Sequence, residues 1–378
     1  MPDNQLSRRG VLIGGAGIAA TGLWRTTTAS ASPVAGTRPA ARTALTPQQL
    51  AGQRVVFSYP GLTPPDSLLR QISAGQAAGV IFFGENISSE AQIASVIGQL
   101  NAAQAQSPVR APLLLMTDQE GGIVRRLPGA PVLSEKQVGA SSDPVTQANL
   151  AGTGAGQNLA GVGMNVNLAP VLDVFRQAGN FIDEFGRSYS SDPRIVTECG
   201  RAFVAAQQTT GVAATAKHFP GLGAATVSQN TDLGPVTLDL SLSDLRSIDE
   251  RPYHQVIAEG VRLVMCSWGL YPALDPDLPA GLSPAIVQGE LRRRLGFGGV
   301  TITDALEAGA ISAFGTPGQT CVLAARAGMD VLLASARDVT EGQAVVTGLA
   351  GALQSGTLDA RTFLTAVGRV TALRLSLA

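Results

Sequence analysis

The sequence predicts a single-domain α/β fold, in which eight parallel strands close into a (β/α)8 barrel, the TIM-barrel architecture. Three observations predict it. Short apolar, β-prone runs alternate with longer helical stretches from Thr46 onward, and there are eight such runs. A helical pattern follows each run. The chain has 378 residues, of which 45% are hydrophobic and 15% charged, so it can bury a core of the size that about 250 residues form in such barrels.

The predicted elements follow one another in a regular order. The candidate strands are residues 54–58, 79–83, 113–117, 164–168, 212–216, 263–266, 299–303 and 331–334. The candidate helices are residues 65–78, 90–105, 144–162, 193–210, 242–259, 284–294, 319–328 and 339–355. Several of these helices begin with Pro or directly after Ser, as helix N-termini commonly do. The alternative is an open, doubly wound sheet. The Gly-rich run 14–17 could suggest it, but that run opens no βαβ unit.

The N-terminal segment is typical of export rather than of folded structure. Ser7-Arg8-Arg9 forms a twin-arginine pattern, an apolar run follows over residues 10–24, and residues 29–31 (ASA) resemble a cleavage site. We therefore expect a twin-arginine signal peptide over residues 1–31, a linker over 32–45 and the barrel over 46–378. The alternative is a membrane anchor, but the apolar run is shorter than the roughly 20 residues that span a bilayer. The sequence predicts a secreted or cell-envelope protein without a stable membrane anchor.

Composition excludes several classes of function. The formal net charge is −1, without acidic or basic blocks, so no nucleic-acid partner is expected. Cys199, Cys266 and Cys321 are too widely spaced for a metal motif, and their odd number rules out a fully paired disulfide framework. The sequence still allows one disulfide between two of these cysteines, although Cys266 lies in an apolar run that favours a buried thiol. We expect neither a metal nor an organic cofactor.

Polar residues follow several of the predicted strands, where barrels of this kind carry their active sites. Three follow the third strand, two the fourth, two the fifth and one the seventh: Asp118, Glu120 and Arg126; Asp173 and Arg187; Lys217 and His218; and Asp304. Carboxylates gathered with Arg, Lys and His are typical of a site that processes sugars.

These residues lie in segments that resemble a known family. Residues 117–126 (TDQEGGIVRR) resemble the DQEGGxVxR motif of family 3 glycoside hydrolases. Residues 168–174, 186–189 and 216–221 resemble further motifs of that family, and residues 296–306 resemble its nucleophile segment. The chain looks most like the single-domain β-N-acetylglucosaminidase branch, which trims peptidoglycan fragments. The resemblance implies a carbohydrate substrate and a single-domain barrel, and we expect a monomer.

The resemblance also implies a role for each matching residue. Asp304 matches the catalytic nucleophile, which forms a covalent glycosyl-enzyme and gives retention of configuration. Five residues match those that bind the sugar hydroxyls of the innermost subsite: Asp118, Arg126, Arg187, Lys217 and His218. Glu120 and Asp173 match positions that support this site. Nearby Lys and Arg side chains would keep a carboxylate nucleophile ionised at neutral pH.

The chain departs from the family at the acid/base loop, which usually reads KHFPGHGxxxxDSH. Ser228 stands at the position of the Asp and Asn230 at the position of the catalytic His, so the expected acid/base dyad is missing. Leu222 replaces the His of GHG, and Trp268 stands where a further His is expected. Asn cannot give or take a proton at neutral pH.

Other groups could replace the dyad. Asp232, Glu184, Glu85 and Glu307 are candidates on loops, although each can equally be a solvated loop carboxylate. His254 lies in a helical stretch, and we expect it to be a half-exposed structural histidine. The Glu that a C-terminal domain supplies in the two-domain branch of the family is not expected here, because the sequence ends soon after the predicted barrel.

Three hypotheses follow. The first is an exported retaining β-glycosidase of the β-N-acetylhexosaminidase type, slowed by the missing dyad. The second is a catalytically impaired pseudo-enzyme that binds cell-wall sugars. The third, a structural envelope protein, is disfavoured because Asp118, Arg126, Arg187, Lys217, His218 and Asp304 are all present together.

Overall fold

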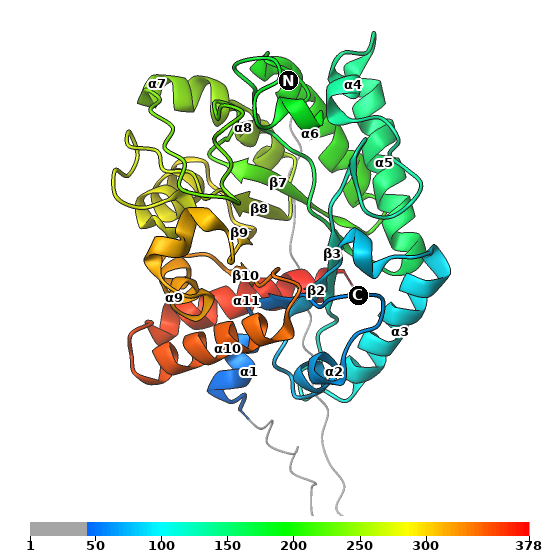
Figure 1. Cartoon of the computed structure of the whole chain (residues 1–378), viewed down its shortest axis with the longest axis vertical. Coiled ribbons are helices and arrows are strands. Elements are labelled where there is room, and N and C mark those ends of the chain that lie inside the picture. Colours follow the sequence, from blue (N-terminus) through cyan, green and yellow to red (C-terminus); the bar gives the residue numbers. More distant parts are fainter. Residues whose placement is uncertain (1–43, 378) are drawn as a thin grey trace, which may run out of the picture. The chain divides into compact units, whose positions relative to one another are not determined.

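The structure is a computed structural model that describes residues 44–377 (Figure 1). The predicted signal peptide and almost all of the predicted linker lie outside these residues. Eight strands form a closed, parallel barrel, which confirms the predicted fold. In barrel order they are β1 (Val55–Phe57), β2 (Gly79–Ile81), β3 (Leu114–Thr117), β6 (Val166–Asn167), β7 (Ala213–Phe219), β8 (Leu263–Cys266), β9 (Val300–Ala305) and β10 (Val331–Leu333). The pairing of Val55 with Leu332 closes the barrel.

A helix follows each barrel strand, as predicted. Seven of these are α-helices and one, η5, is π-helical. They are α2 (Asp66–Ser73), α3 (Glu90–Ala105), α5 (Pro144–Val162), α6 (Pro193–Gln208), α8 (Arg251–Ala258), η5 (Ala285–Arg294), α9 (Pro317–Ala327) and α10 (Val339–Gln354). Side chains of Ser89, Asp143, Asp192 and Asp338 accept hydrogen bonds from first-turn backbone N–H groups of α3, α5, α6 and α10. These caps satisfy donors that would otherwise lack a partner.

One predicted helix is interrupted. The sequence pattern predicts a continuous helix over residues 242–259, but the structure has α7 (Leu242–Asp244), a π-helical turn η3 (Leu245–Asp249) and then α8. Pro252 explains the break, because proline has no N–H to donate and is tolerated in the first turn of a helix rather than in its interior. Pro252 lies in the first turn of α8.

Two differences concern the strands near the cavity. β7 runs to Phe219 rather than ending at residue 216, so Lys217 and His218 belong to the strand instead of following it. A small antiparallel hairpin, β4 (Gln119–Gly121) with β5 (Val124–Arg125), was not predicted and directly follows β3. The other short elements are α1 (Pro47–Gly52), η1 (Gly84–Asn86), α4 (Glu135–Gly139), η2 (Asp183–Phe185), η4 (Ala280–Leu282) and η6 (Gly309–Phe314).

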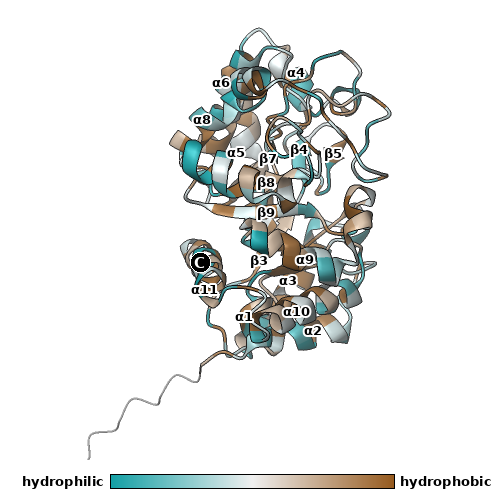
Figure 2. Ribbon diagram, turned by 90° about the vertical axis from the view of Figure 1, so that its left-hand side faces the viewer, coloured by the Kyte–Doolittle hydropathy of each residue, from teal (hydrophilic) through white to brown (hydrophobic). Residues whose placement is uncertain are grey.

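The apolar core has two main layers. Side chains such as Val56, Met116, Ile302 and Leu333 fill the barrel interior. A larger cluster fills the space between the strands and the surrounding helices. Figure 2 shows hydrophobic, brown segments along β9, whereas the outward-facing parts of α8 are hydrophilic and teal. This arrangement is that of a packed barrel rather than of a pore.

A last helix, α11 (Ala360–Ser376), covers the amino-terminal end of the barrel. Its Val370 and Leu373 join the interior cluster, and Figure 1 shows it in red beside β2 and β10. Arg374 is fully buried and donates to the carbonyls of Ala111 and Pro112. α11 was not predicted from the sequence, although its apolar residues recur at helical spacing. Within residues 44–377, no helix combines the length and the apolar character that crossing a bilayer requires.

Candidate functional site

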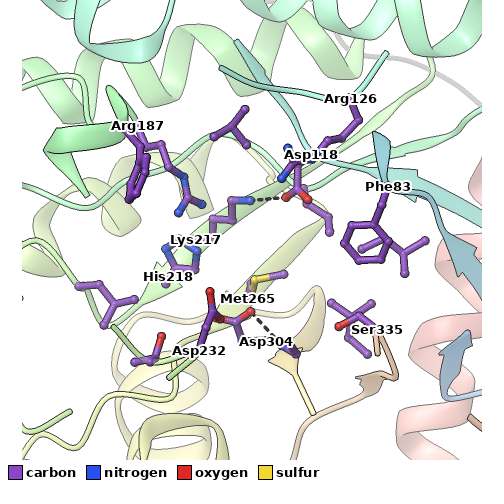
Figure 3. Close-up of a pocket in the computed structure, with 18 of the residues that line it drawn as sticks. Phe83, Asp118, Arg126, Arg187, Lys217, His218, Asp232, Met265, Asp304 and Ser335 are labelled. Atoms are coloured by element: carbon purple, nitrogen blue, oxygen red, sulfur yellow. Dashed lines mark hydrogen bonds and ion pairs between the residues drawn. The ribbon is translucent and has the colours of Figure 1, made fainter. Parts of the chain in front are cut away.

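A cavity of about 250 Å³ opens at the carboxyl ends of the barrel strands (Figure 3). Seven charged or titratable side chains line it: Asp118, Arg126, Arg187, Lys217, His218, Asp232 and Asp304. Six of them are the residues to which the sequence assigned the nucleophile and substrate-binding roles. Because they come from separate strands and loops, only the closed barrel brings them together.

A lysine held between two carboxylates forms one wall of the cavity. Lys217 Nζ lies 2.7 Å from Asp118 Oδ1 and 2.7 Å from Glu120 Oε1. Arg187 donates two hydrogen bonds of 2.8 Å to Glu120. Burial alone would raise the pKa of Glu120, but the charges of Arg187 and Lys217 outweigh it and lower that pKa to about 2. Glu120 is buried behind the wall and positions both cations.

The hairpin β4–β5 positions Asp118 and Arg126 on this wall. The backbone N–H of Arg126 donates to the carbonyl of Asp118 at 3.2 Å. Gly121 permits the tight turn, because its φ is 120° and a Cβ there would lie 2.2 Å from the carbonyl oxygen of Leu133. Arg126 Nε is buried and has no hydrogen-bond partner among residues 44–377. A buried donor beside a polar cavity suits a ligand with hydroxyl groups.

His218 is oriented by Asp173. The Nδ1 atom of His218 lies 2.7 Å from Asp173 Oδ2, and Asp173 Oδ1 accepts the backbone N–H of Leu222 at 2.6 Å. Because the carboxylate is the acceptor, Nδ1 carries a proton and Nε2 is the ring nitrogen available to a bound ligand. Asp173 itself is buried and does not line the cavity.

Asp304 lies at the end of β9, on the opposite side of the cavity from Arg126 (Figure 3). Its Oδ1 accepts the backbone N–H of Ala305 at 2.9 Å. The carbonyl of Ala305 accepts a 2.7 Å hydrogen bond from Trp268 Nε1. Trp268, which replaces an expected histidine, is buried and therefore fixes the strand end that carries Asp304.

Ser228 and Asn230 stand in the loop where the sequence predicts that an acid/base dyad is missing. Ser228 is exposed, and its hydroxyl contacts only that of Thr226. Neither Ser228 nor Asn230 lines the cavity, whereas Leu222 lines it as a buried apolar residue. Two residues beyond Asn230, Asp232 does line the cavity.

The remaining candidates lie elsewhere. Glu85, Glu184 and Glu307 are exposed, and none of them lines the cavity. Glu85 pairs with Arg337 at 3.4 Å, and Glu307 accepts the hydroxyl of Ser335 at 2.9 Å. His254 is exposed on α8, away from the cavity, rather than half-exposed as expected.

The cavity also has an apolar part, which was not predicted from the sequence. It includes Phe83, Phe181, Phe185 and Met265. Phe185 is 42% exposed, which makes its ring accessible at the cavity. Aromatic rings offer large apolar faces to the C–H face of a bound molecule. The signal in the sequence was weak, because nothing in the local pattern separates these rings from core residues.

Neither a metal centre nor a disulfide is found in the described part of the chain. Residues 44–377 contain no group of three or more His, Cys, Asp or Glu side chains arranged to hold a metal ion. Cys199, Cys266 and Cys321 are all buried and free, so the single disulfide that the sequence allowed is not formed.

The fold is a closed (β/α)8 barrel, and carboxylates, arginines, a lysine and a histidine meet at the carboxyl ends of its strands. This combination is that of a glycoside hydrolase. The chain belongs to glycoside hydrolase family 3, because residues 49–373 match the model of the glycosyl hydrolase family 3 N terminal domain.

Individual relatives agree with this assignment. The chain is 49% identical over 326 residues to an uncharacterized secreted glycosyl hydrolase of Arthroderma benhamiae, covering 86% of this chain and 92% of the relative. A family 3 β-N-acetylglucosaminidase of Paenibacillus sp. str. FPU-7 superimposes with a TM-score of 0.83 at 36% identity, covering 88% of this chain but 63% of that one. A β-N-acetylhexosaminidase of Beutenbergia cavernae superimposes with a TM-score of 0.79 at 33% identity, covering 88% and 99%. The chain is thus a glycoside hydrolase of the β-hexosaminidase-like group.

Proposed function

We propose that the protein is a retaining β-glycosidase of the β-N-acetylhexosaminidase type, with Asp304 as its nucleophile. The observation that carries this proposal is the position of Asp304 in one cavity with Asp118, Lys217, Arg187 and His218. A carboxylate that lines a cavity together with hydrogen-bonding groups of both charges suits attack on an anomeric carbon.

In this mechanism the wall opposite Asp304 holds the sugar. Asp118 and Lys217 supply an acceptor and a donor that are already paired at 2.7 Å, while Arg126 Nε and His218 Nε2 supply further groups for hydroxyls. These groups are fixed by buried partners before a substrate arrives, so little reorganisation is needed on binding. Asp304 then forms an ester with the anomeric carbon, and water hydrolyses that ester.

We propose that the sugars come from peptidoglycan fragments and that the twin-arginine segment exports the protein. The sequence pattern of residues 1–31 and the secreted relative support export. The match to proteins named as β-N-acetylglucosaminidase and β-N-acetylhexosaminidase supports an N-acetylated sugar.

One observation favours a second candidate, a catalytically impaired protein that binds cell-wall sugars. Ser228 and Asn230, at the usual acid/base positions, do not line the cavity and carry no acid or base. The two candidates differ in whether a covalent intermediate forms.

Trapping that intermediate separates them. The protein is incubated with a fluorinated N-acetylglucosaminyl fluoride, and intact-mass and peptide mass spectrometry locate the added sugar. A single sugar on the peptide that contains Asp304 supports the enzyme, whereas saturable binding without any adduct favours the binding protein. Asp304→Asn should abolish both the adduct and the hydrolysis of aryl N-acetylglucosaminides. Asp239→Asn, an exposed aspartate of the loop after β7, is the matched control and should leave both unchanged.

A second experiment tests the substrate. Hydrolysis of a peptidoglycan-derived disaccharide is compared with that of a chitin disaccharide, with aryl glycosides as the common reference. Preference for the peptidoglycan disaccharide supports the proposed substrate, and preference for the chitin disaccharide contradicts it.

A further inference from the structure

A retaining glycosidase needs a proton donor that the usual loop positions do not provide here. When the bond to the leaving group breaks, an alkoxide must be protonated, and a later step must remove a proton from water. Ser228 is exposed outside the cavity and Asn230 does not titrate, so neither residue meets this need. The group responsible must be an acid whose carboxyl reaches the cavity that contains Asp304.

Among the acidic residues of the cavity, Asp232 fits this requirement. It is exposed and lines the cavity, and Figure 3 shows it next to Asp304. The third acidic residue of the lining, Asp118, is engaged by Lys217 at 2.7 Å. The other carboxylates considered, Glu85, Glu184 and Glu307, do not line the cavity.

Three hydrogen bonds, one to a side chain and two between backbone groups, fix the segment that carries Asp232. The side chain of Asn230 accepts the N–H of Asp232 at 2.8 Å. The carbonyls of Asp232 and Thr231 accept the N–H groups of Gly309 and Ala310, at 2.9 and 3.0 Å. Gly309 and Ala310 begin η6, the turn that follows the Asp304 strand. The loop is therefore tied to the chain segment that follows the nucleophile.

The electrostatic surroundings of Asp232 favour its protonated form. Partial burial raises the pKa of Asp232, and the negative charge of Asp304 raises it further. His218 and Arg187 act in the opposite direction, and Asp118 adds a smaller increase, so the direction of the shift is upward. An acid facing a carboxylate nucleophile keeps its proton to a higher pH than a free aspartate does, as the first step requires.

We propose that Asp232 is the general acid and base of this glycosidase, in place of the missing dyad. The inference rests on the proposed retaining mechanism. In the first step the Asp232 carboxylic acid gives its proton to the glycosidic oxygen, while Asp304 bonds to the anomeric carbon and the leaving alcohol departs. In the second step the Asp232 carboxylate takes a proton from water, whose oxygen bonds to the anomeric carbon as the ester to Asp304 breaks. Both carboxyls return to their starting states.

The test compares wild type, Asp232→Asn and Asp304→Asn on two aryl N-acetylglucosaminides, a dinitrophenyl and a phenyl glycoside. Dinitrophenolate leaves without a proton, whereas phenolate needs one. For Asp232→Asn, kcat/KM on the phenyl glycoside should fall by about 10² to 10⁴-fold. The loss on the dinitrophenyl glycoside should be far smaller, and the glycosyl-enzyme should accumulate. The decline in kcat/KM of wild type at high pH should be absent in the variant.

Azide separates catalysis from structure. Azide attacks the glycosyl-enzyme without a base, so it should accelerate Asp232→Asn on the dinitrophenyl glycoside and yield a β-glycosyl azide. Wild type and Asp239→Asn should show no acceleration. A structural defect in Asp232→Asn would lower kcat/KM equally on both glycosides and would give no glycosyl azide.

Each result has one meaning. Near wild-type activity of Asp232→Asn on the phenyl glycoside, or equal losses on both substrates without a glycosyl azide, overturns the role of Asp232. Absence of a glycosyl-enzyme in wild type overturns the proposed function itself. Melting temperatures within about 2 °C of wild type establish that the variants are folded.

Discussion

The side-chain oxygen of Asn230 accepts a hydrogen bond from the backbone N–H of Asp232 over 2.8 Å. Asn side chains commonly fold the backbone two residues ahead in this way. The carbonyl of Asn230 also accepts the N–H groups of Leu233 and Gly234, at 3.1 and 3.2 Å. Asn230 therefore shapes the turn that presents Asp232 to the cavity.

Asn230→Ala should lower activity without unfolding the protein. Loss of one neutral hydrogen bond, worth about 0.5–1.5 kcal/mol, loosens the turn and should reduce kcat on the phenyl glycoside by roughly 2- to 10-fold. Steady-state kinetics and thermal melting measure the two effects. Ser228→Ala is the matched control, because its hydroxyl contacts only that of Thr226. Equal activity of the two variants would contradict a role for the Asn230 turn.

Gly309→Ala should displace the loop that carries Asp232. A Cβ at this position would lie 2.4 Å from the carbonyl oxygen of Leu233, so the two segments would have to separate. We expect kcat on the phenyl glycoside to fall by about 10-fold or more, with a smaller loss on the dinitrophenyl glycoside. Gly298→Ala is the control, since a Cβ there meets no atom within 4 Å. If Gly309→Ala keeps full activity on both glycosides, close packing of the loop against η6 is unnecessary.

Glu120→Gln should weaken both the fold and the binding of sugar. Glu120 is paired with Arg187 and Lys217, so removing its charge leaves Arg187 without its ion-pair partner and Lys217 paired with Asp118 alone. Breaking a buried ion pair typically costs about 3–5 kcal/mol of unfolding free energy. Urea unfolding measures this loss, and calorimetric titration with N-acetylglucosamine should show weaker binding. Glu184→Gln, which removes an exposed carboxylate that does not line the cavity, should change neither quantity. A stable, tightly binding Glu120→Gln would show that the cations need no partner.

Glu341 should make stability depend on pH. Burial raises the pKa of Glu341 from 4.5 to about 7, with the charge of Glu307 adding to the effect of burial. The folded state therefore holds a proton that the unfolded state releases, so the free energy of unfolding falls as pH rises from about 4.5 to 7. Glu341→Gln should flatten this slope in urea unfolding measured across the same range. The exposed Glu198→Gln should retain it. An unchanged slope in Glu341→Gln would contradict the assignment.

The sequence predicted the strands, most of the helices and the charged residues of the cavity. It did not predict the apolar residues that line the cavity. Alternating apolar runs and helical periodicity are local features, so β1 to β10 and their helices could be found residue by residue. The break at Pro252 and the helix α11 were missed, even though each has a local signal. The apolar lining by Phe181 and Phe185 has no such signal, because an aromatic residue on a loop looks the same whether it faces a cavity or the core.

By itself, the sequence determined the barrel, the set of charged residues at its strand ends and the presence of Ser228 and Asn230 in the loop after β7. Those features depend on residue identity and on spacing along the chain. Only the tertiary structure decided which carboxylate shares the cavity with Asp304. Asp232 and Glu307 are both acidic loop residues in the sequence, but the packing of residues 231–233 against Gly309 brings Asp232 to the cavity. Glu307 is not part of the lining and accepts a hydrogen bond from Ser335, which is part of it. The physical reason is that contacts between segments far apart in sequence decide whether a side chain lines the cavity. The spacing of residues along the chain does not encode these contacts.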